Sequence, residues 1–260
     1  MTLLVVGLWP YRSAIFVKNR SWENLNDIVT PFIAIKTPEG TGPFPVVLVF
    51  PGCEGVKPER AKPRMDWLVN AGYMAVMVDS HSGRGLNEDA VCSGYALWGS
   101  ERAGDLYIAL NFIKHHPLAN TNKVAILGYS HGGWTILDAL SYNGKLPRGL
   151  DSAPEDLFSM IKAAVVYYPY CGYPSRARYS FSSPIPLLAI HAGQDSTVDP
   201  EACTHLMTSW QNQGLPITSI TYPNIKHCFD IAGHKNFDPK AHDKVLSALA
   251  EFLTNTLNKT

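Results

Sequence analysis

Short apolar segments alternate with longer helical patterns along most of this 260-residue chain, and this alternation restricts its fold more than any other feature. Candidate strands lie at 31–38, 44–52, 73–79, 123–127, 163–168, 185–191 and 216–222. Helical patterns cover 58–71, 98–116, 131–142, 199–213 and 240–257. Short apolar runs of this kind are typical of buried parallel strands. Their alternation with helices predicts an α/β fold with a mostly parallel central sheet and helices on both faces.

The composition fits one globular domain with a well-filled core, since 46% of the residues are hydrophobic and 17% are charged. We expect a single domain over 1–260, with an N-terminal extension at 1–25. Glycine-rich and proline-rich stretches at 80–97 and 143–160 interrupt the alternation and predict loop or cap insertions, with little or no separate cap domain.

Charge gives no sign of a macromolecular partner. Lys plus Arg and Asp plus Glu number 22 each, and no run of like charges occurs. The sequence therefore argues against a nucleic-acid groove and against binding to an acidic membrane surface, and favours a small-molecule substrate. It leaves the oligomeric state open.

The five cysteines, at 53, 92, 171, 203 and 228, form no CxxC pair and no cluster with metal-ligand spacing. Their odd number predicts reduced thiols rather than a disulfide framework. The apolar segment "TLLVVGLW" near the N-terminus has no preceding Lys or Arg and no cleavage site after it, so it does not fit a signal peptide. Together these features favour a cytoplasmic location. No metal or organic cofactor is implied.

The segment Gly128-Tyr129-Ser130-His131-Gly132 falls where a strand pattern changes to a helix pattern. A sharp strand-to-helix turn brings the backbone close to its neighbours and tolerates little beyond glycine two positions from the serine. Such a turn presents the serine hydroxyl at the end of the sheet. Ser130 is therefore the candidate nucleophile.

A serine hydroxyl needs a base to take its proton and a carboxylate to orient that base. Asp195 and Asp199 follow the strand at 185–191, and Asp195 lies nearer to the strand end. Asp199 precedes Pro200 and is expected to cap the next helix. Of the histidines that follow a later strand in a loop, His227 comes sooner than His234. We expect Ser130, Asp195 and His227 to form a catalytic triad.

Acyl transfer also needs donors for the developing oxyanion. The first residue of a helix has an N–H without an intrahelical partner, so His131 supplies one candidate backbone donor. The turn "FPGCEG" after the strand at 44–52 supplies a second, the N–H of Cys53. Cys53 is expected to act through its backbone rather than its sulfur.

In family order, the segments "VVLVFPGCEG", "VDSHSGRG", "GYSHGG", "GQDSTVDP" and "HCF" resemble the α/β-hydrolase superfamily and, within it, the dienelactone hydrolase family. The resemblance extends from about Phe44 to the C-terminal helix. It implies a cofactor-free hydrolase with little cap, acting on ester bonds of small substrates, with Ser130 as nucleophile, His227 as base and Asp195 as its orienting acid.

Two departures from the family pattern bear on the substrate. Dienelactone hydrolases carry cysteine where this chain has Ser130, so a thiolate mechanism is not available there. They also hold the substrate carboxylate with two arginines; Arg84 matches the first, or pairs with Glu88 or Asp89 instead, and the second has no counterpart near Ile231. A generic esterase of small carboxylic esters is therefore the better expectation.

Several aromatic residues follow strand ends or lie in the irregular loops, where a substrate crevice is expected. The candidates for substrate contact are Arg84, Tyr129, Tyr168, Tyr170 and Trp98. Aromatic rims suit apolar substrates, although they also suit ordinary loop packing. Alternative functions for the same residues are a peptidase, a thioesterase, a deacetylase, or a binding protein of this fold that does no chemistry.

Overall fold

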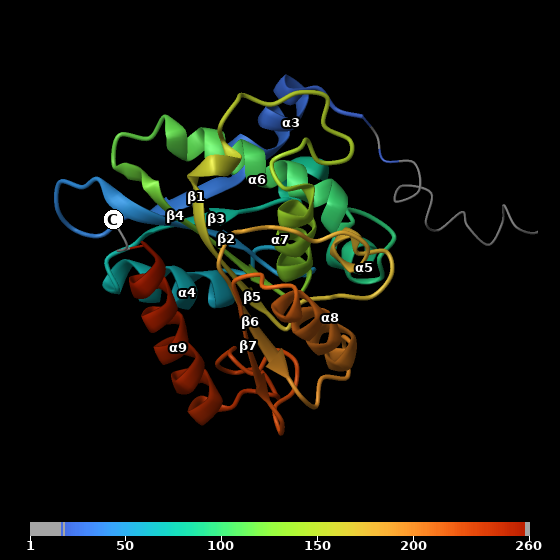
Figure 1. Cartoon of the computed structure of the whole chain (residues 1–260). Helices are drawn as coiled ribbons and strands as arrows, with labels where there is room; N and C mark the ends of the chain where they lie inside the picture. The colour runs from blue at the N-terminus through green and yellow to red at the C-terminus, as the bar shows by residue number, and fades with distance from the viewer. Residues whose placement is uncertain (1–16, 18, 258–260) are drawn as a thin grey trace, which may run out of the picture.

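The computed structural model describes residue 17 and residues 19–257, so the first sixteen residues of the expected N-terminal extension lie outside the described part. Seven strands form one sheet in the order β1-β3-β2-β4-β5-β6-β7 (Figure 1). The strands are β1 (Ile33–Lys36), β2 (Phe44–Phe50), β3 (Met74–Val78), β4 (Ala119–Tyr129), β5 (Ile161–Tyr167), β6 (Leu187–Ala192) and β7 (Ile217–Tyr222).

The expected α/β fold with a mostly parallel sheet is confirmed. β1 pairs antiparallel with β3, and every other neighbouring pair is parallel. The central strands β2, β3 and β4 are buried at their apolar residues on both faces, which explains their continuous rather than alternating apolar character. Because parallel strands end at the same edge of the sheet, the loops after them gather there.

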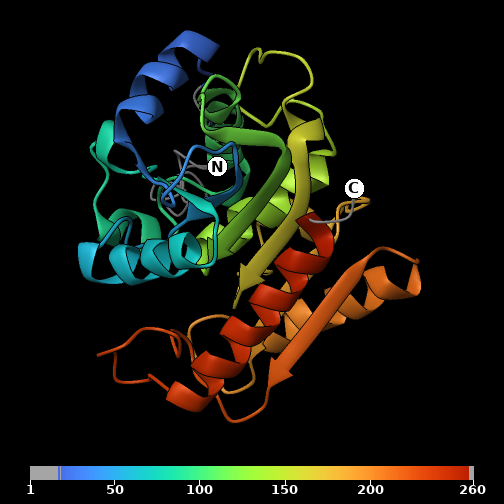
Figure 2. The ribbon, with the colours of Figure 1, turned by 90° about the vertical axis from the view of Figure 1, so that its left-hand side faces the viewer.

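Helices cover both faces of the sheet. Their bounds are α3 (Trp22–Val29), α4 (Pro58–Asn70), α5 (Glu88–Cys92), α6 (Gly99–Lys114), α7 (His131–Tyr142), α8 (Pro200–Asn212) and α9 (Pro239–Leu257). In Figure 2, α4 and α9 lie across the face of the sheet that is turned to the viewer. The other face packs against α3, α6, α7 and α8, and each face has its own buried apolar cluster. None of the helices in the described part is long and apolar enough to span a membrane.

The two predicted insertions are mostly irregular. The 80–97 segment contains a short 3₁₀ turn (Ser82–Arg84) and the five-residue α5, and the 143–160 segment contains a 3₁₀ turn at Phe158–Met160. The chain at Arg20 pairs with Leu150, so the described end of the N-terminal extension lies beside the second insertion. α3 follows directly, capped by the Ser21 side chain.

The expectation of reduced thiols is wrong for four of the five cysteines. Disulfides join Cys53 to Cys92 and Cys171 to Cys203, and only Cys228 is free. Five cysteines can form two pairs and leave one thiol free, so the odd count did not exclude disulfides. The paired residues lie 39 and 32 positions apart, and only the fold brings them together. Disulfides are typical of oxidising compartments, so one ground for expecting a cytoplasmic location is removed.

Thiol titration of the denatured protein, without reductant, should count about one free thiol, and five after reduction. Closing loops of this length limits the unfolded chain, so reduction should lower the free energy of unfolding by about 2–4 kcal/mol per bridge. Urea unfolding with and without reductant measures this change. Cys228→Ser should respond to reductant as the native chain does; five reactive thiols before reduction would contradict the bridges.

A second prediction concerns His191 on β6, which is 1% exposed and whose Nε2 has no hydrogen-bond partner in the described part of the chain. Burial lowers its pKa from 6.5 to about 4. Between these values the unfolded chain binds a proton that the folded protein does not, so the free energy of unfolding falls as the pH falls. His191→Leu should remove about 2–3 kcal/mol of this loss between pH 7 and pH 4.

Urea unfolding at a series of pH values checks this slope. His205→Leu, at an exposed position on α8, serves as the control and should keep the native slope. Equal slopes for His191→Leu and the native protein would refute the assignment.

Candidate active site

Ser130 occupies a sharp turn between β4, which ends at Tyr129, and α7, which begins at His131. Its φ of 51° and ψ of −111° lie outside the regions that residues other than glycine favour. The turn also requires close backbone contact: a Cβ on Gly132 would lie 2.1 Å from the carbonyl oxygen of Phe50, and one on Gly128 would lie 2.4 Å from that of Gly132. The two glycines therefore let α7 pack directly on the ends of β2 and β4.

The structure brings the three predicted triad residues together from separate loops. His227 Nε2 lies 3.0 Å from Ser130 Oγ, and His227 Nδ1 lies 2.6 Å from Asp195 Oδ2. The Asp195 carboxylate is buried, and its other oxygen accepts hydrogen bonds from the N–H groups of Thr197 and Val198. A carboxylate accepts the Nδ1 proton, which leaves the Nε2 lone pair facing the serine hydroxyl.

The alternative residues for these positions lie elsewhere. Asp199 caps α8 by accepting from the N–H groups of Glu201 and Ala202, as predicted. The Nδ1 of His234 accepts from the N–H of Asn236 instead of contacting the serine.

Two backbone donors lie beside Ser130. Within the described part of the chain, neither the N–H of Cys53 nor that of His131 donates a hydrogen bond. His131 is the first residue of α7, where the helix dipole places partial positive charge. The Cys53–Cys92 disulfide ties the turn after β2, which carries the first donor, to the C-terminal end of α5.

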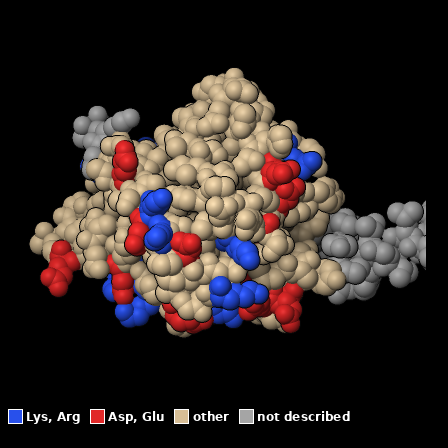
Figure 3. Space-filling view, turned by 90° about the horizontal axis from the view of Figure 1, so that it is seen from below, with Lys and Arg blue, Asp and Glu red and all other residues tan. Residues whose placement is uncertain are grey.

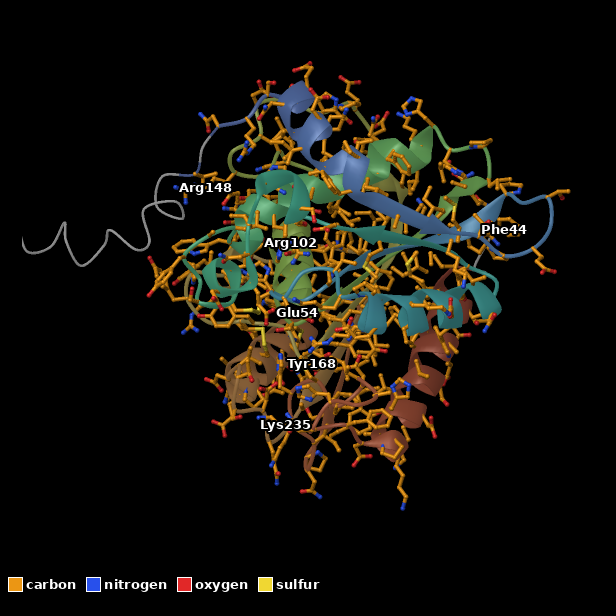
Figure 4. All side chains as sticks on the ribbon, turned by 180° about the vertical axis from the view of Figure 1, so that it is seen from behind. Phe44, Glu54, Arg102, Arg148, Tyr168 and Lys235 are labelled. Atoms are coloured by element: carbon orange, nitrogen blue, oxygen red, sulfur yellow. A yellow bond between two sulfur atoms is a disulfide. The ribbon has the colours of Figure 1, made fainter. Side chains whose placement is uncertain are left out.

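A fully buried arginine on α6, which the sequence analysis did not single out, connects the segments that carry these donors. Arg102 donates to Pro51 O at 2.9 Å and to Ser80 Oγ at 2.8 Å, and its Nη1 lies 3.1 Å from His131 Nδ1 (Figure 4 shows Arg102 well inside the molecule). Burial lowers its pKa to about 10, so the guanidinium stays protonated at neutral pH and donates. Burial and Arg102 hold the pKa of His131 well below 6.5, so that its neutral ring accepts at Nδ1.

A buried ion pair supports the loop that carries His227. Asp230, three residues after His227, pairs with Arg64 of α4 at 2.8 Å and accepts from the Tyr168 hydroxyl. The Tyr168 ring packs against the His227 ring with centroids 4.4 Å apart. The Arg64 guanidinium also lies over the Tyr129 ring, 3.4 Å from its centroid.

Three of the residues predicted to contact the substrate make other contacts in the structure and do not line the pocket that contains Ser130. Arg84 makes a bidentate ion pair with Asp105, rather than with Glu88 or Asp89, and its side chain is only 4% exposed. Tyr129 lines a separate cavity beneath α4, and Tyr168 supports the histidine. Each of these side chains contacts a residue distant in sequence: Asp105 for Arg84, Arg64 for Tyr129 and Asp230 for Tyr168.

A pocket of about 520 Å³ opens at Ser130, within the size range of small-molecule sites. Trp98 and Tyr170 line it, as predicted for substrate contact, together with Trp134 and Tyr173, which the sequence analysis did not select. Trp134 lies one turn into α7, where its apolar character read as ordinary helix core. Both disulfides border this region: Cys53 and Cys92 line the pocket, and Cys171 follows Tyr170.

The family model of the dienelactone hydrolase family matches residues 33–257, which is most of the chain. The chain belongs to the dienelactone hydrolase family. This sequence match supports the general assignment of the chain as a hydrolase.

The curated proteins to which this chain is similar have about a quarter of their aligned residues in common with it. Dipeptidyl peptidase family member 6 of Caenorhabditis elegans is 24% identical over 207 residues, 70% of this chain and 28% of the relative. Acylamino-acid-releasing enzyme 1 of Oryza sativa subsp. japonica is 25% identical over 211 residues, 71% of this chain and 27% of the relative. The chain thus spans little more than a quarter of the length of these relatives.

Solved structures share the fold at low sequence identity. A candidate dienelactone hydrolase from Klebsiella pneumoniae superposes with a TM-score of 0.68 at 16% identity, covering 85% of this chain and 92% of that one. Esterase 2 of Thermogutta terrifontis with bound propionate gives 0.64 at 19% identity, covering 86% and 88%.

The position of Arg102 predicts a specific defect. Lysine keeps the charge but cannot reach Pro51, Ser80 and His131 together, so Arg102→Lys should lower kcat for a model ester by about 10- to 100-fold while KM changes less than about threefold. Steady-state kinetics and thermal melting measure the two effects. Arg84→Lys is the matched control, because the Arg84 side chain is similarly buried and bonds to Asp105 and to Ser80 O but to neither donor segment; it should keep kcat near the native value. Equal losses in both variants would assign Arg102 to stability alone.

Proposed function

We propose that this protein is a serine carboxylesterase that cleaves small esters through an acyl-enzyme on Ser130. The observation that carries the proposal is the chain of contacts from Asp195 through His227 to Ser130, at 2.6 and 3.0 Å. These are hydrogen-bond distances, as proton transfer from a serine to a general base requires.

In the proposed acylation step, the Ser130 oxygen bonds to the ester carbonyl carbon as His227 Nε2 takes the hydroxyl proton. The carbonyl oxygen becomes an oxyanion, for which the free N–H groups of Cys53 and His131 are the donors at hand. When the tetrahedral intermediate collapses, the bond to the alcohol oxygen breaks, and the alcohol leaves with the proton from His227. The buried Asp195 carboxylate stabilises the imidazolium that exists between these transfers.

Deacylation repeats the sequence with water. His227 removes a proton from the water, whose oxygen attacks the acyl carbon, and Ser130 leaves as the alcohol with that proton. The products are the carboxylic acid and the original enzyme. Every proton in the proposed cycle passes through His227 Nε2.

The similarity to esterase 2 extends over 88% of that chain, whereas the named peptidases are matched over little more than a quarter of their length. This contrast favours an esterase over a peptidase. A binding protein without chemistry would not need Ser130 in a costly backbone conformation, since such conformations cluster at functional sites.

Ser130→Ala should lower kcat for methyl butyrate by about 10⁴-fold or more, because no other hydroxyl replaces the nucleophile. Asp195→Asn should lower kcat by about 10⁴-fold, because the amide favours the wrong imidazole tautomer. Titration of released butyric acid measures both rates.

A fluorophosphonate probe with intact-mass spectrometry gives the second readout. One adduct should form on the native protein and none on Ser130→Ala. Folded native protein that forms no adduct and cleaves no ester would favour the binding protein, and faster cleavage of aminoacyl amides than of the matching esters would favour a peptidase.

A further inference from the structure

The wall of the pocket at Ser130 is mostly apolar. Four aromatic rings contribute to it, beside aliphatic side chains, the Cys53–Cys92 disulfide and the side chains of Ser93 and Thr197. Trp98 and Trp134 are 8% and 4% exposed, and the Trp98 ring meets the Tyr173 ring edge-on with centroids 6.4 Å apart. The Trp134 and Tyr170 rings lie 5.0 Å apart at 55°. Four rings from three segments thus surround one volume beside the serine.

The polar groups of three of these rings are bonded within the protein, and the fourth ring, Tyr173, is largely exposed. Trp98 Nε1 donates to Gly94 O, Trp134 Nε1 donates to Asp138 Oδ2, and the Tyr170 hydroxyl donates to the carbonyl oxygen of Tyr173. At these three rings a ligand therefore meets faces and edges, and the free donors in the pocket include the backbone N–H groups beside Ser130. Rings arranged at steep angles like these suit another aromatic ring, because the electron-rich face of one ring attracts the edge of another.

The pocket also lacks charge. No residue lining it in the described part of the chain is Lys, Arg, Asp or Glu, and the low pKa of its histidine keeps that ring neutral. Arg84, the arginine that the family resemblance placed at the substrate, is committed to Asp105. On the face of the molecule shown in Figure 3, acidic and basic side chains are interspersed, with no extended patch of one sign. No charged side chain among the described residues that line the pocket would offset the cost of removing a substrate carboxylate from water.

We propose that the aromatic pocket formed by Trp98, Trp134, Tyr170 and Tyr173 selects esters that carry an uncharged aromatic ring. This inference rests on the proposed esterase function and adds the class of substrate. The pocket, with a volume of about 520 Å³, has room for a ring together with the ester group, since a cavity of about 150 Å³ already binds benzene. The proposal covers a ring on either side of the ester bond, and each side has its own test.

Reactivity-matched ester pairs test the preference. On the acid side, methyl phenylacetate is compared with methyl cyclohexylacetate; on the alcohol side, benzyl acetate is compared with cyclohexylmethyl acetate. Each pair has the same chain length and differs mainly in ring planarity and electron distribution. We expect kcat/KM to favour the aromatic member about 3- to 10-fold on at least one side. Equal or lower values for the aromatic members in both pairs would overturn the inference.

A carboxylated substrate tests the lack of charge. Adding a para-carboxylate to methyl phenylacetate should lower kcat/KM at least tenfold. An unchanged or raised value would overturn the claim that the ring must be uncharged.

Two exposed tyrosines provide a matched pair of variants. Tyr173 is 71% exposed at the pocket, and Tyr179, six residues later, is 69% exposed and does not line it. Tyr173→Ala should reduce the aromatic-to-cyclohexyl ratio of kcat/KM toward one, through KM, and Tyr173→Phe should retain it. Tyr179→Ala should leave the ratio as in the native protein; an identical ratio in Tyr173→Ala would remove that ring from the proposal.

Methyl butyrate separates this inference from the proposed function. Hydrolysis of methyl butyrate that depends on Ser130, with no aromatic preference, overturns the inference alone. Absence of hydrolysis of every ester overturns the proposed function, and the substrate class with it.

Discussion

The buried guanidinium of Arg102 holds together the ends of segments that the chain would otherwise leave independent. It bonds at once to the carbonyl after β2, to the serine after β3 and to the first side chain of α7. Each bond is ordinary in strength, but all lie away from water, where an unpaired donor or acceptor is costly. The donor segments beside Ser130 therefore have little freedom to separate, and oxyanion stabilisation depends on donors that are fixed before reaction.

The loop that carries His227 is also held by a buried arginine, here Arg64. Arg64 reaches from α4 to Asp230, which receives the Tyr168 hydroxyl, and the Tyr168 ring lies against His227. A helix on one face of the sheet thus fixes a loop at its edge. Ser130, His227 and the two backbone donor segments are each held by hydrogen bonds or ring contacts within the fold. The two disulfides add covalent links where the pocket wall consists of short irregular segments.

The sequence predicted the parts of this structure that depend on local pattern. Periodicity located every strand and most helices to within a few residues, and the order of serine, acid and histidine at strand ends picked out Ser130, Asp195 and His227. The start of β4 was missed because Asn120–Asn122 are polar, although Ala119 and Asn120 pair with β2. Contacts across the fold left no local signal. Arg84 was read against its nearest acids, whereas its partner Asp105 lies 21 positions away, and the cysteine pairs span even longer separations.

The conformation of Ser130 has a consequence for the rest of the molecule. A residue with a side chain at φ 51° and ψ −111° costs of the order of 1–3 kcal/mol, and the surrounding packing must supply that energy in every folded copy. Glycine would relieve the strain at the same position. If Ser130 is the nucleophile, as proposed, the glycine variant would be inactive and would still outlast the native protein in a thermal challenge. Selection for durability alone would therefore favour glycine here, and only a requirement for the hydroxyl would favour serine.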